Sequence, residues 1–166
     1  MAKGGKKKGL PPQGDRVLAT NRRAKFDYEL GDRWEAGLSL IGSEARSLRD
    51  TAPGINEAFV DFDWRGEAWV KQMRIAPMKH AAFGHEELRP RKLLLHRSEL
   101  ERLRMRVEKE GMTLVPTKVY YRKGRAKLEI ALARGKKNYD KRQSIKAKTA
   151  DREAAAAISR GRKDYD

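Results

Sequence analysis

The chain has 166 residues, of which 39% are hydrophobic and 37% charged, and its 39 Lys and Arg outnumber 23 Asp and Glu to give a formal net charge of +16. This charge favours a polyanionic partner, with nucleic acid ahead of a membrane surface. Cysteine is absent, which excludes disulfides and thiolate chemistry, and no apolar run approaches the roughly 20 residues that span a bilayer, so we expect one cytoplasmic domain with tails and no membrane partner.

The N-terminal quarter predicts one disordered segment, two strands and one helix. Residues 1–16 are rich in Lys, Gly and Pro, a composition typical of disorder. Residues 24–40 alternate in polarity on both sides of Gly31-Asp32, which predicts a β-hairpin with its turn at that dipeptide. Ser43 then suits the N-cap of a short helix over 44–49.

Two more hairpins and a helix complete the expected body. The hairpin strands are joined at dipeptides that favour tight turns: 60–64 and 68–73 at Arg65-Gly66, and 113–121 and 125–133 at Lys123-Gly124. Between the hairpins, residues 78–90 predict a loop, and Ser98 to Glu101 match a capping box that opens a helix ended by Gly111. Six strands in three hairpins predict a mainly β fold, an OB-type antiparallel six-stranded barrel with short accessory helices, although a two-sheet sandwich has the same pattern.

The chain changes character at Gly135. Residues 135–166 form a basic tail with few large apolar residues. The alanines at 154–157 favour a helix, but no continuous apolar stripe is present to dock it. We therefore expect a folded body over 17–134 and a tail that is disordered alone and becomes helical against a partner.

No catalytic or metal motif has the spacing that its chemistry requires. His85-Glu86 starts like the H-E-x-x-H zinc motif, but Arg89 takes its last position. His80, His85 and His96 would need a carboxylate from elsewhere to hold zinc, and loop histidines without a role are commoner. Phosphate-binding glycine loops and nucleophile elbows are also absent from the sequence. We expect no enzyme activity, no metal and no cofactor.

Two clusters favour nucleic-acid binding, each beside a structural alternative. Residues 89–92 are basic and precede the apolar run 93–95, so their cations would either clamp phosphates or lie in a solvated loop. Tyr120 and Tyr121 are able to stack on bases, although strand alternation places at least one of them in the core. These features also fit a general basic OB-fold protein that binds single-stranded RNA or DNA.

Five blocks, in the same order along the chain, resemble the tmRNA-binding small protein B family, also called SsrA-binding protein. The blocks are Asn21-Arg22-Arg23-Ala24, Glu35-Ala36-Gly37-Leu38, Gly42-Ser43-Glu44-Ala45-Arg46-Ser47-Leu48-Arg49, Arg91-Lys92-Leu93-Leu94-Leu95-His96, and Gly135-Lys136-Lys137 with Asp140-Lys141-Arg142. Each block is short, but their combination and order are specific. The resemblance implies an OB-type body and a C-terminal tail that is disordered in isolation.

The resemblance also implies a non-enzymatic role in bacterial ribosome rescue. Members of the family bind the tRNA-like domain of tmRNA and accompany it to stalled ribosomes, where the body takes the place of a tRNA anticodon arm. Their tail enters the small-subunit decoding centre and the empty mRNA channel, and the nascent chain is then tagged in trans-translation. On this basis the chain is expected to be a monomer that binds one tmRNA.

Particular residues follow from the resemblance. The tmRNA contacts, or positions near them in the same blocks, fall on Asn21, Glu35, Arg46, Lys92, Leu94 and Lys127. The tail segment needed on the ribosome falls on Gly135, Lys136, Lys137, Tyr139, Asp140, Lys141 and Arg142. Lys and Arg neutralise phosphates, and Leu94 is able to pack on an unpaired base. Three residues depart from the family pattern: Ala45 replaces a valine, Arg46 replaces a lysine and keeps its charge, and Tyr139 stands where a histidine is frequent.

Overall fold

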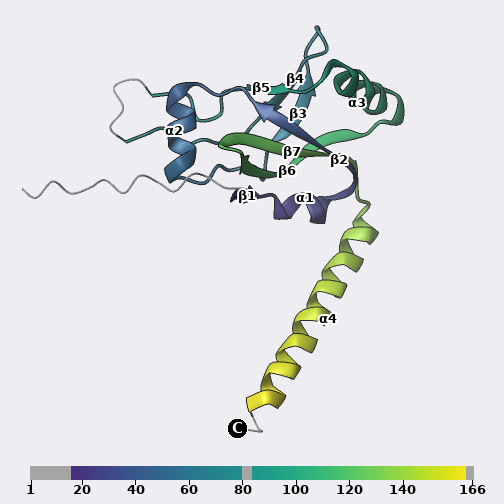
Figure 1. Cartoon of the computed structure of the whole chain (residues 1–166). Helices are drawn as coiled ribbons and strands as arrows, with labels where there is room; N and C mark the ends of the chain where they lie inside the picture. Colours follow the sequence, from purple (N-terminus) through teal and green to yellow (C-terminus); the bar gives the residue numbers. More distant parts are fainter. Residues whose placement is uncertain (1–15, 80–83, 164–166) are drawn as a thin grey trace, which may run out of the picture.

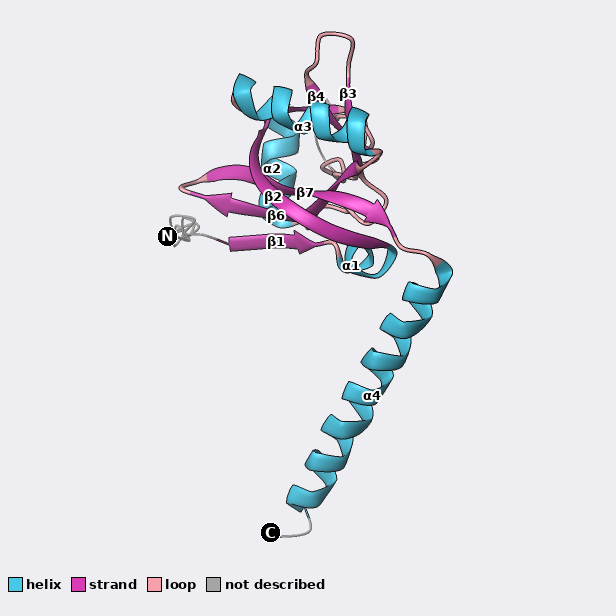
Figure 2. Ribbon diagram, turned by 90° about the vertical axis from the view of Figure 1, so that its right-hand side faces the viewer, coloured by secondary structure: helices cyan, strands magenta, loops and turns pink. Residues whose placement is uncertain are grey.

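The computed structural model describes residues 16–79 and 84–163, without the side chains of 138–140 and 160–163. One long helix extends from a β-rich body (Figures 1 and 2). The elements in chain order are β1 (Arg16–Thr20), α1 (Arg22–Asp27), β2 (Tyr28–Leu38), α2 (Gly42–Asp50), β3 (Phe59–Phe62), β4 (Ala68–Lys71), β5 (Arg91–Leu94), α3 (Arg97–Glu110), β6 (Thr113–Arg122), β7 (Arg125–Gly135) and α4 (Asn138–Lys163). The expected disorder of 1–16 lies outside the described residues, except at Arg16, which begins β1.

The strands form one antiparallel sheet whose last six members close on themselves. The order is β1-β6-β3-β4-β5-β2-β7, and a further pairing of β6 with β7 joins the two ends of the six-strand part. β1 is the additional strand, paired along part of β6. The mainly β antiparallel fold with short helices is therefore confirmed, with seven strands in the described residues instead of the predicted six.

Two of the predicted hairpins are confirmed, one of them with the turn at the predicted dipeptide. Lys123 and Gly124 both have positive φ, at 50° and 75°, and Arg122 pairs with Arg125, as a two-residue primed turn requires. In the β3–β4 hairpin β3 ends at Phe62 and β4 begins at Ala68, so Trp64, which was predicted in the strand, lies in the loop; the predicted turn residue Gly66 has a φ of 79°. Local turn chemistry was sufficient to locate these connections.

The first predicted hairpin is wrong. Asn21 instead opens α1, because its Oδ1 accepts a hydrogen bond from the Ala24 backbone nitrogen at 3.0 Å. β2 then runs unbroken through Gly31-Asp32, where the register with β7 shifts between Leu30 and Arg33. A bulge bends a strand without reversing its direction. The alternation of polar and apolar residues before and after Gly31-Asp32 therefore belongs to one continuous strand. The closed six-strand part of the sheet therefore contains β5 in place of one strand of the predicted first hairpin.

The helix ends also differ in detail from the expectation. α3 ends at Gly111, whose φ of 61° confirms the predicted C-cap. Its N-cap is His96, whose backbone nitrogen donates to Glu99 at 3.1 Å, so the predicted capping box was placed two residues too late. α2 starts at Gly42 and its N-cap is Ile41, whose backbone nitrogen donates to the Glu44 carboxylate at 3.1 Å, so the predicted Ser43 N-cap is wrong.

A buried ion network joins α2 to β5. Glu44 and Arg91 are both fully buried, and the Arg91 Nε donates to Glu44 at 2.8 Å. Arg89 adds two hydrogen bonds to the same carboxylate, and the Arg91 guanidinium also donates to the Met73 and Glu87 carbonyls. Burial raises the pKa of Glu44, but the hydrogen bond from Arg89 and the charge of Arg91 outweigh it, so this pKa lies below its ordinary value. Arg91 is therefore neither a phosphate clamp nor a solvated loop residue.

The expectation of an unstructured tail is also wrong in this structure. α4 is a helix of 26 residues, and it leaves the body as a single projecting rod (Figures 1 and 2). The side chains described from 145 to 159 are exposed, including Ile145 and Ile158. The helix propensity of the alanines decides the local structure, while the missing apolar stripe explains why α4 does not pack along the body.

Candidate nucleic-acid interface

A row of outward-facing residues crosses four neighbouring strands. Gly37 of β2 pairs with Leu94 of β5 on one side and with Lys127 of β7 on the other. Lys127 in turn pairs with Tyr120 of β6. Directly paired residues of antiparallel strands point to the same face of the sheet, so these four residues lie side by side on the outside of the body. We call them the outer row.

Within the outer row, the absence of a side chain at Gly37 lets Leu94 lie flat on the sheet as an exposed apolar platform. A Cβ added to Gly37 would lie only 3.1 Å from the Leu94 Cβ, so the leucine lies closely across the glycine backbone. Leu94 is nevertheless 55% exposed. An aliphatic side chain held against the sheet but open to solvent is suited to pack on the face of an unpaired base.

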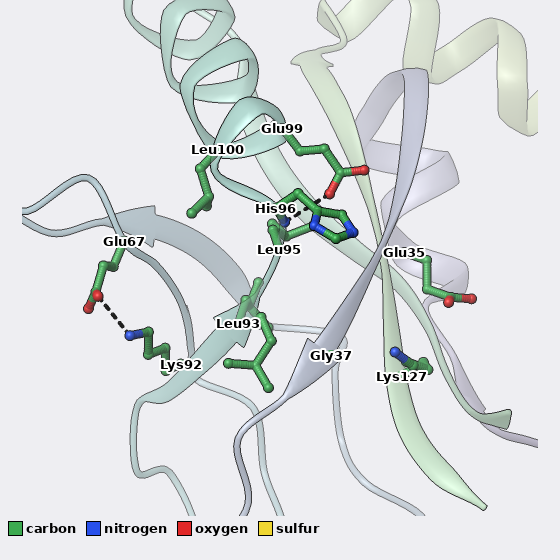
Figure 3. Close-up of a pocket in the computed structure, with 11 residues that line it drawn as sticks. Glu35, Gly37, Glu67, Lys92, Leu93, Leu95, His96, Glu99, Leu100 and Lys127 are labelled. Carbon is green, nitrogen blue, oxygen red and sulfur yellow. Dashed lines mark hydrogen bonds and ion pairs between the residues drawn. The ribbon is translucent and has the colours of Figure 1, made fainter. Parts of the chain in front are cut away.

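Two grooves flank this platform. The larger, of about 650 Å³, is lined among others by Glu35, Glu67 and Lys92 and the first turn of α3 (Figure 3). The smaller, of about 460 Å³, has a floor that includes Leu38 and Leu40, and its charged lining residues are all cations: Arg49, Arg125 and Lys127. Gly37, Leu94 and Lys127 line both grooves and so form the ridge between them.

Glu35 is held in place on the side of Lys127 (Figure 3). Tyr120 donates a hydroxyl hydrogen bond to its carboxylate, and Arg122 donates at 3.0 Å. The Tyr120 hydrogen bond and the charges of Arg122 and Lys127 outweigh desolvation, so the pKa of Glu35 is below its ordinary value. Glu35 is therefore an ionised carboxylate whose orientation is fixed by Tyr120 and Arg122. Burial and the same carboxylate raise the pKa of Tyr120, which stays a hydroxyl donor.

Lys92 and Arg46 lie in different surroundings. The Lys92 Nζ is 2.7 Å from Glu67, and about a third of each side chain is exposed at the edge of the larger groove. Arg46 is exposed on α2 but lines neither groove. The structure thus brings together four of the six predicted RNA contacts: Glu35, Lys92, Leu94 and Lys127.

Asn21 lies apart from this surface. It is 3% exposed, and its amide nitrogen donates to the carbonyls of Ile55 at 3.1 Å and Pro116 at 2.9 Å. Together with the cap of α1, these bonds use both amide hydrogens and one acceptor position. Asn21 holds the β1–α1 junction against β6, and in this conformation it offers RNA no exposed polar hydrogen.

The predicted tail residues divide into anchors and exposed cations. The Lys136 Nζ donates to the Lys25 carbonyl at 3.0 Å and to Ser144 at 3.2 Å, and the Lys141 Nζ lies 3.6 Å from Asp27 of α1. Gly135 is the last residue of β7, and Lys137 and Arg142 are exposed. The side chains of Tyr139 and Asp140 lie outside the described part of the chain. α1 is therefore the seat of the tail helix.

Several residues of this surface escaped sequence reasoning. Arg125 and Glu67 lie in no sequence block, and Arg49 ends the third block but was given no role; all three reach the grooves only through the fold. The tyrosine pair contained a usable signal, because one alternation step buries Tyr121 and turns Tyr120 outward.

The two histidines that the structure describes are not arranged to hold a metal. His85 is buried, with Nδ1 2.9 Å from the Ser43 hydroxyl and Nε2 2.9 Å from the Ile75 carbonyl, so it links α2 to the strand-flanking loops. His96 caps α3, and His80 lies outside the described residues. Over the described ranges, no cluster of three or more His, Asp or Glu is close enough to bind an ion. In the same ranges no helix is both long and apolar enough to cross a membrane.

Comparison with known proteins shows the family of the chain. The model of the SmpB family, described as SmpB protein, matches residues 18–160. The chain belongs to the SmpB family. The resemblance found in the five sequence blocks is thereby confirmed, and SmpB membership covers the body and most of the tail helix.

Relatives of the SmpB family match over nearly the whole chain. The SsrA-binding protein of Sorangium cellulosum (strain So ce56) is 47% identical over 160 residues, which is 96% of this chain and 97% of the relative. The SsrA-binding protein of Solidesulfovibrio magneticus (strain ATCC 700980 / DSM 13731 / RS-1) is 46% identical over 148 residues, or 89% and 96% of the two chains. A solved structure described as "tmRNA-SmpB: a journey to the center of the bacterial ribosome" is 42% identical with a TM-score of 0.61, covering 74% of this chain and 86% of that chain.

Proposed function

We propose that the protein is an RNA-binding adaptor that binds the tRNA-like domain of tmRNA and accompanies it to stalled ribosomes for trans-translation. The observation that carries this proposal is the ridge of Gly37, Leu94 and Lys127 between two grooves, on a chain of the SmpB family. Since bacterial ribosomes work in the cytoplasm, the adaptor acts there. It acts as a monomer, with one copy for each tmRNA.

The body, residues 17–134, supplies RNA recognition. Lys127 and the two groove arginines Arg49 and Arg125 neutralise backbone phosphates, while Lys92 keeps its contact with Glu67 and donates its remaining ammonium hydrogens to a phosphate. Leu94 packs against an unpaired base, and the fixed carboxylate of Glu35 accepts from a ribose hydroxyl or base amine. Recognition thus depends on where unpaired nucleotides stand in a folded RNA.

The tail, residues 135–166, works on the ribosome. α4 has 26 residues, so it extends about 39 Å from its seat on α1, long enough to follow an empty mRNA channel from the decoding centre. Lys137 and Arg142 are exposed at its base for contact with ribosomal RNA. Lys136 and Lys141 instead fix the direction in which the helix leaves the body.

Competition binding at a fixed, near-physiological salt concentration tests the proposal. Full-length protein is bound to labelled tRNA-like domain of tmRNA and challenged with unfolded RNA of equal length. We expect the folded RNA to be preferred several hundredfold or more, roughly 4 kcal/mol, because the body recognises a shape. Near-equal competition would contradict the adaptor function and leave a general basic OB-fold protein for single-stranded RNA or DNA, the function that net charge alone favours.

A further inference from the structure

The tip of the β3–β4 hairpin presents an aromatic ring to solvent. Trp64 is 84% exposed, and the guanidinium carbon of Arg65 lies 4.7 Å from the centre of its ring. The hairpin projects from the body beside α3 (Figures 1 and 2). One face of the indole is thus covered by a cation, while most of the residue remains in contact with water.

This tip is held in one conformation by Asp63. Its carboxylate accepts hydrogen bonds from the backbone nitrogens of Arg65 at 3.0 Å and Glu67 at 2.9 Å, and from the Trp69 indole at 3.0 Å. The Asp63 backbone pairs with Glu67 and also accepts from Gly66, and the positive φ of Gly66 completes the turn. A preorganised aromatic residue loses little conformational entropy when a partner binds it.

The surroundings of Trp64 connect it to the RNA surface. A third groove, of about 330 Å³, lies between the hairpin and α3 and is lined by three cations, Arg65, Arg97 and Arg104. It shares Glu67, Leu95 and Leu100 with the larger groove beside the Leu94 ridge.

The acidic residues of this third groove are already neutralised. Glu67 pairs with Lys92 at 2.7 Å, and Glu101 pairs with Arg97 at 3.3 Å. Within the described part of the chain, Arg65 has no ion-pair partner. The groove therefore leads from the ridge to a tip that carries an available positive charge beside an aromatic face.

We propose that Trp64 and Arg65 form a second stacking site, which binds an unpaired nucleobase of the same RNA molecule that occupies the Leu94 ridge. The base stacks on the open face of Trp64, and Arg65, stacked on the other face, also neutralises a neighbouring phosphate. This inference rests on the proposed function, because it extends the RNA footprint from the ridge across the Lys92–Glu67 pair to the hairpin.

The test is titration of labelled tRNA-like domain with the full-length protein and its W64A, W64F, W64L and R65A variants. Base stacking predicts that W64A binds about five- to a hundredfold more weakly, with W64F close to wild type and W64L close to W64A. W64A leaves the salt dependence unchanged, whereas R65A lowers the slope of log Kobs against log salt by about 0.7 to 0.9. RNA should also quench tryptophan fluorescence in wild type but much less in W64A.

The possible results distinguish failure of the Trp64 stacking site from failure of the proposed adaptor function. If W64A binds RNA within twofold of wild type and keeps the full quenching, the stacking site is wrong, while a weakened L94A measured in parallel still supports the adaptor. Unchanged RNA binding by W64A together with reduced tagging on stalled ribosomes would place the partner of Trp64 on the ribosome and also overturn the inference. Circular dichroism melting checks that each variant is folded, and the exposure of Trp64 predicts little change.

Discussion

Replacement of Leu94 by alanine isolates the contribution of the apolar platform to RNA affinity. The substitution removes three carbons, each worth about 0.8 kcal/mol when fully buried. Because Leu94 is 55% exposed in the free protein, roughly half of this gain remains for the RNA to complete, about 1.3 kcal/mol. We therefore expect L94A to bind the tRNA-like domain about tenfold more weakly.

The assay is direct titration of labelled RNA at two salt concentrations. L94A removes no charge, so the salt dependence of binding should stay that of wild type. Met105→Ala is the matched control, since Met105 is 52% exposed on α3 and lines none of the three grooves. Equal binding by L94A and wild type, or an equal loss in M105A, would refute the assignment of Leu94 as the platform.

Three further predictions concern the supports of this surface. Glu44→Gln should lower the free energy of unfolding in urea by roughly 3–5 kcal/mol, because a buried guanidinium loses its counter-charge, whereas exposed Glu101→Gln should change it little. Since the folded pKa of Glu44 is depressed, its contribution is complete above the unfolded value of 4.5 and is lost as pH falls through the folded pKa, so wild type should lose its advantage over E44Q in acid. Tyr120→Phe should raise the pKa of Glu35 towards its ordinary value, measured by NMR titration of the carboxyl group. Asp27→Ala should speed hydrogen exchange in the first turns of α4 and leave RNA affinity unchanged.

Each of these has a clear contrary result. Equal unfolding free energies of E44Q and wild type at neutral pH would mean that the network does not support α2. An unchanged titration of Glu35 in Y120F would show that its pKa is set by the cations alone. Weakened RNA binding in D27A would mean that the seat of the tail belongs to the RNA surface.

Sequence reasoning succeeded where the decisive interactions are local. The turns at Gly66 and Lys123-Gly124 and the C-cap at Gly111 each depend on a positive φ within a few residues, which residue type indicates directly. It failed for Gly31-Asp32, because a bulge and a turn carry the same residue types and only pairing with β7 distinguishes them.

In the candidate site, too, local patterns predict some features, while others depend on contacts distant in sequence. Alternation is enough to turn Leu94 and Lys92 outward and Arg91 inward, but the reason that an arginine tolerates burial is Glu44, 47 residues away. Asn21 illustrates the converse, since a motif residue with RNA-binding chemistry is used to cap a helix. Which polar residues face a partner is decided by contacts distant in sequence, and these require the fold.

The central claim is that the body binds the RNA and the tail acts on the ribosome. The most direct measurement compares full-length protein with a chain ended after Lys136, which keeps the whole of β7 and the Lys136–Asp27 backbone hydrogen bond. Both are assayed for affinity to the tRNA-like domain and for tagging of nascent chains on stalled ribosomes. The account predicts affinities within about threefold of each other, roughly 0.6 kcal/mol, with tagging abolished in the shortened chain. Loss of RNA affinity on truncation, or tagging without the tail, would contradict it.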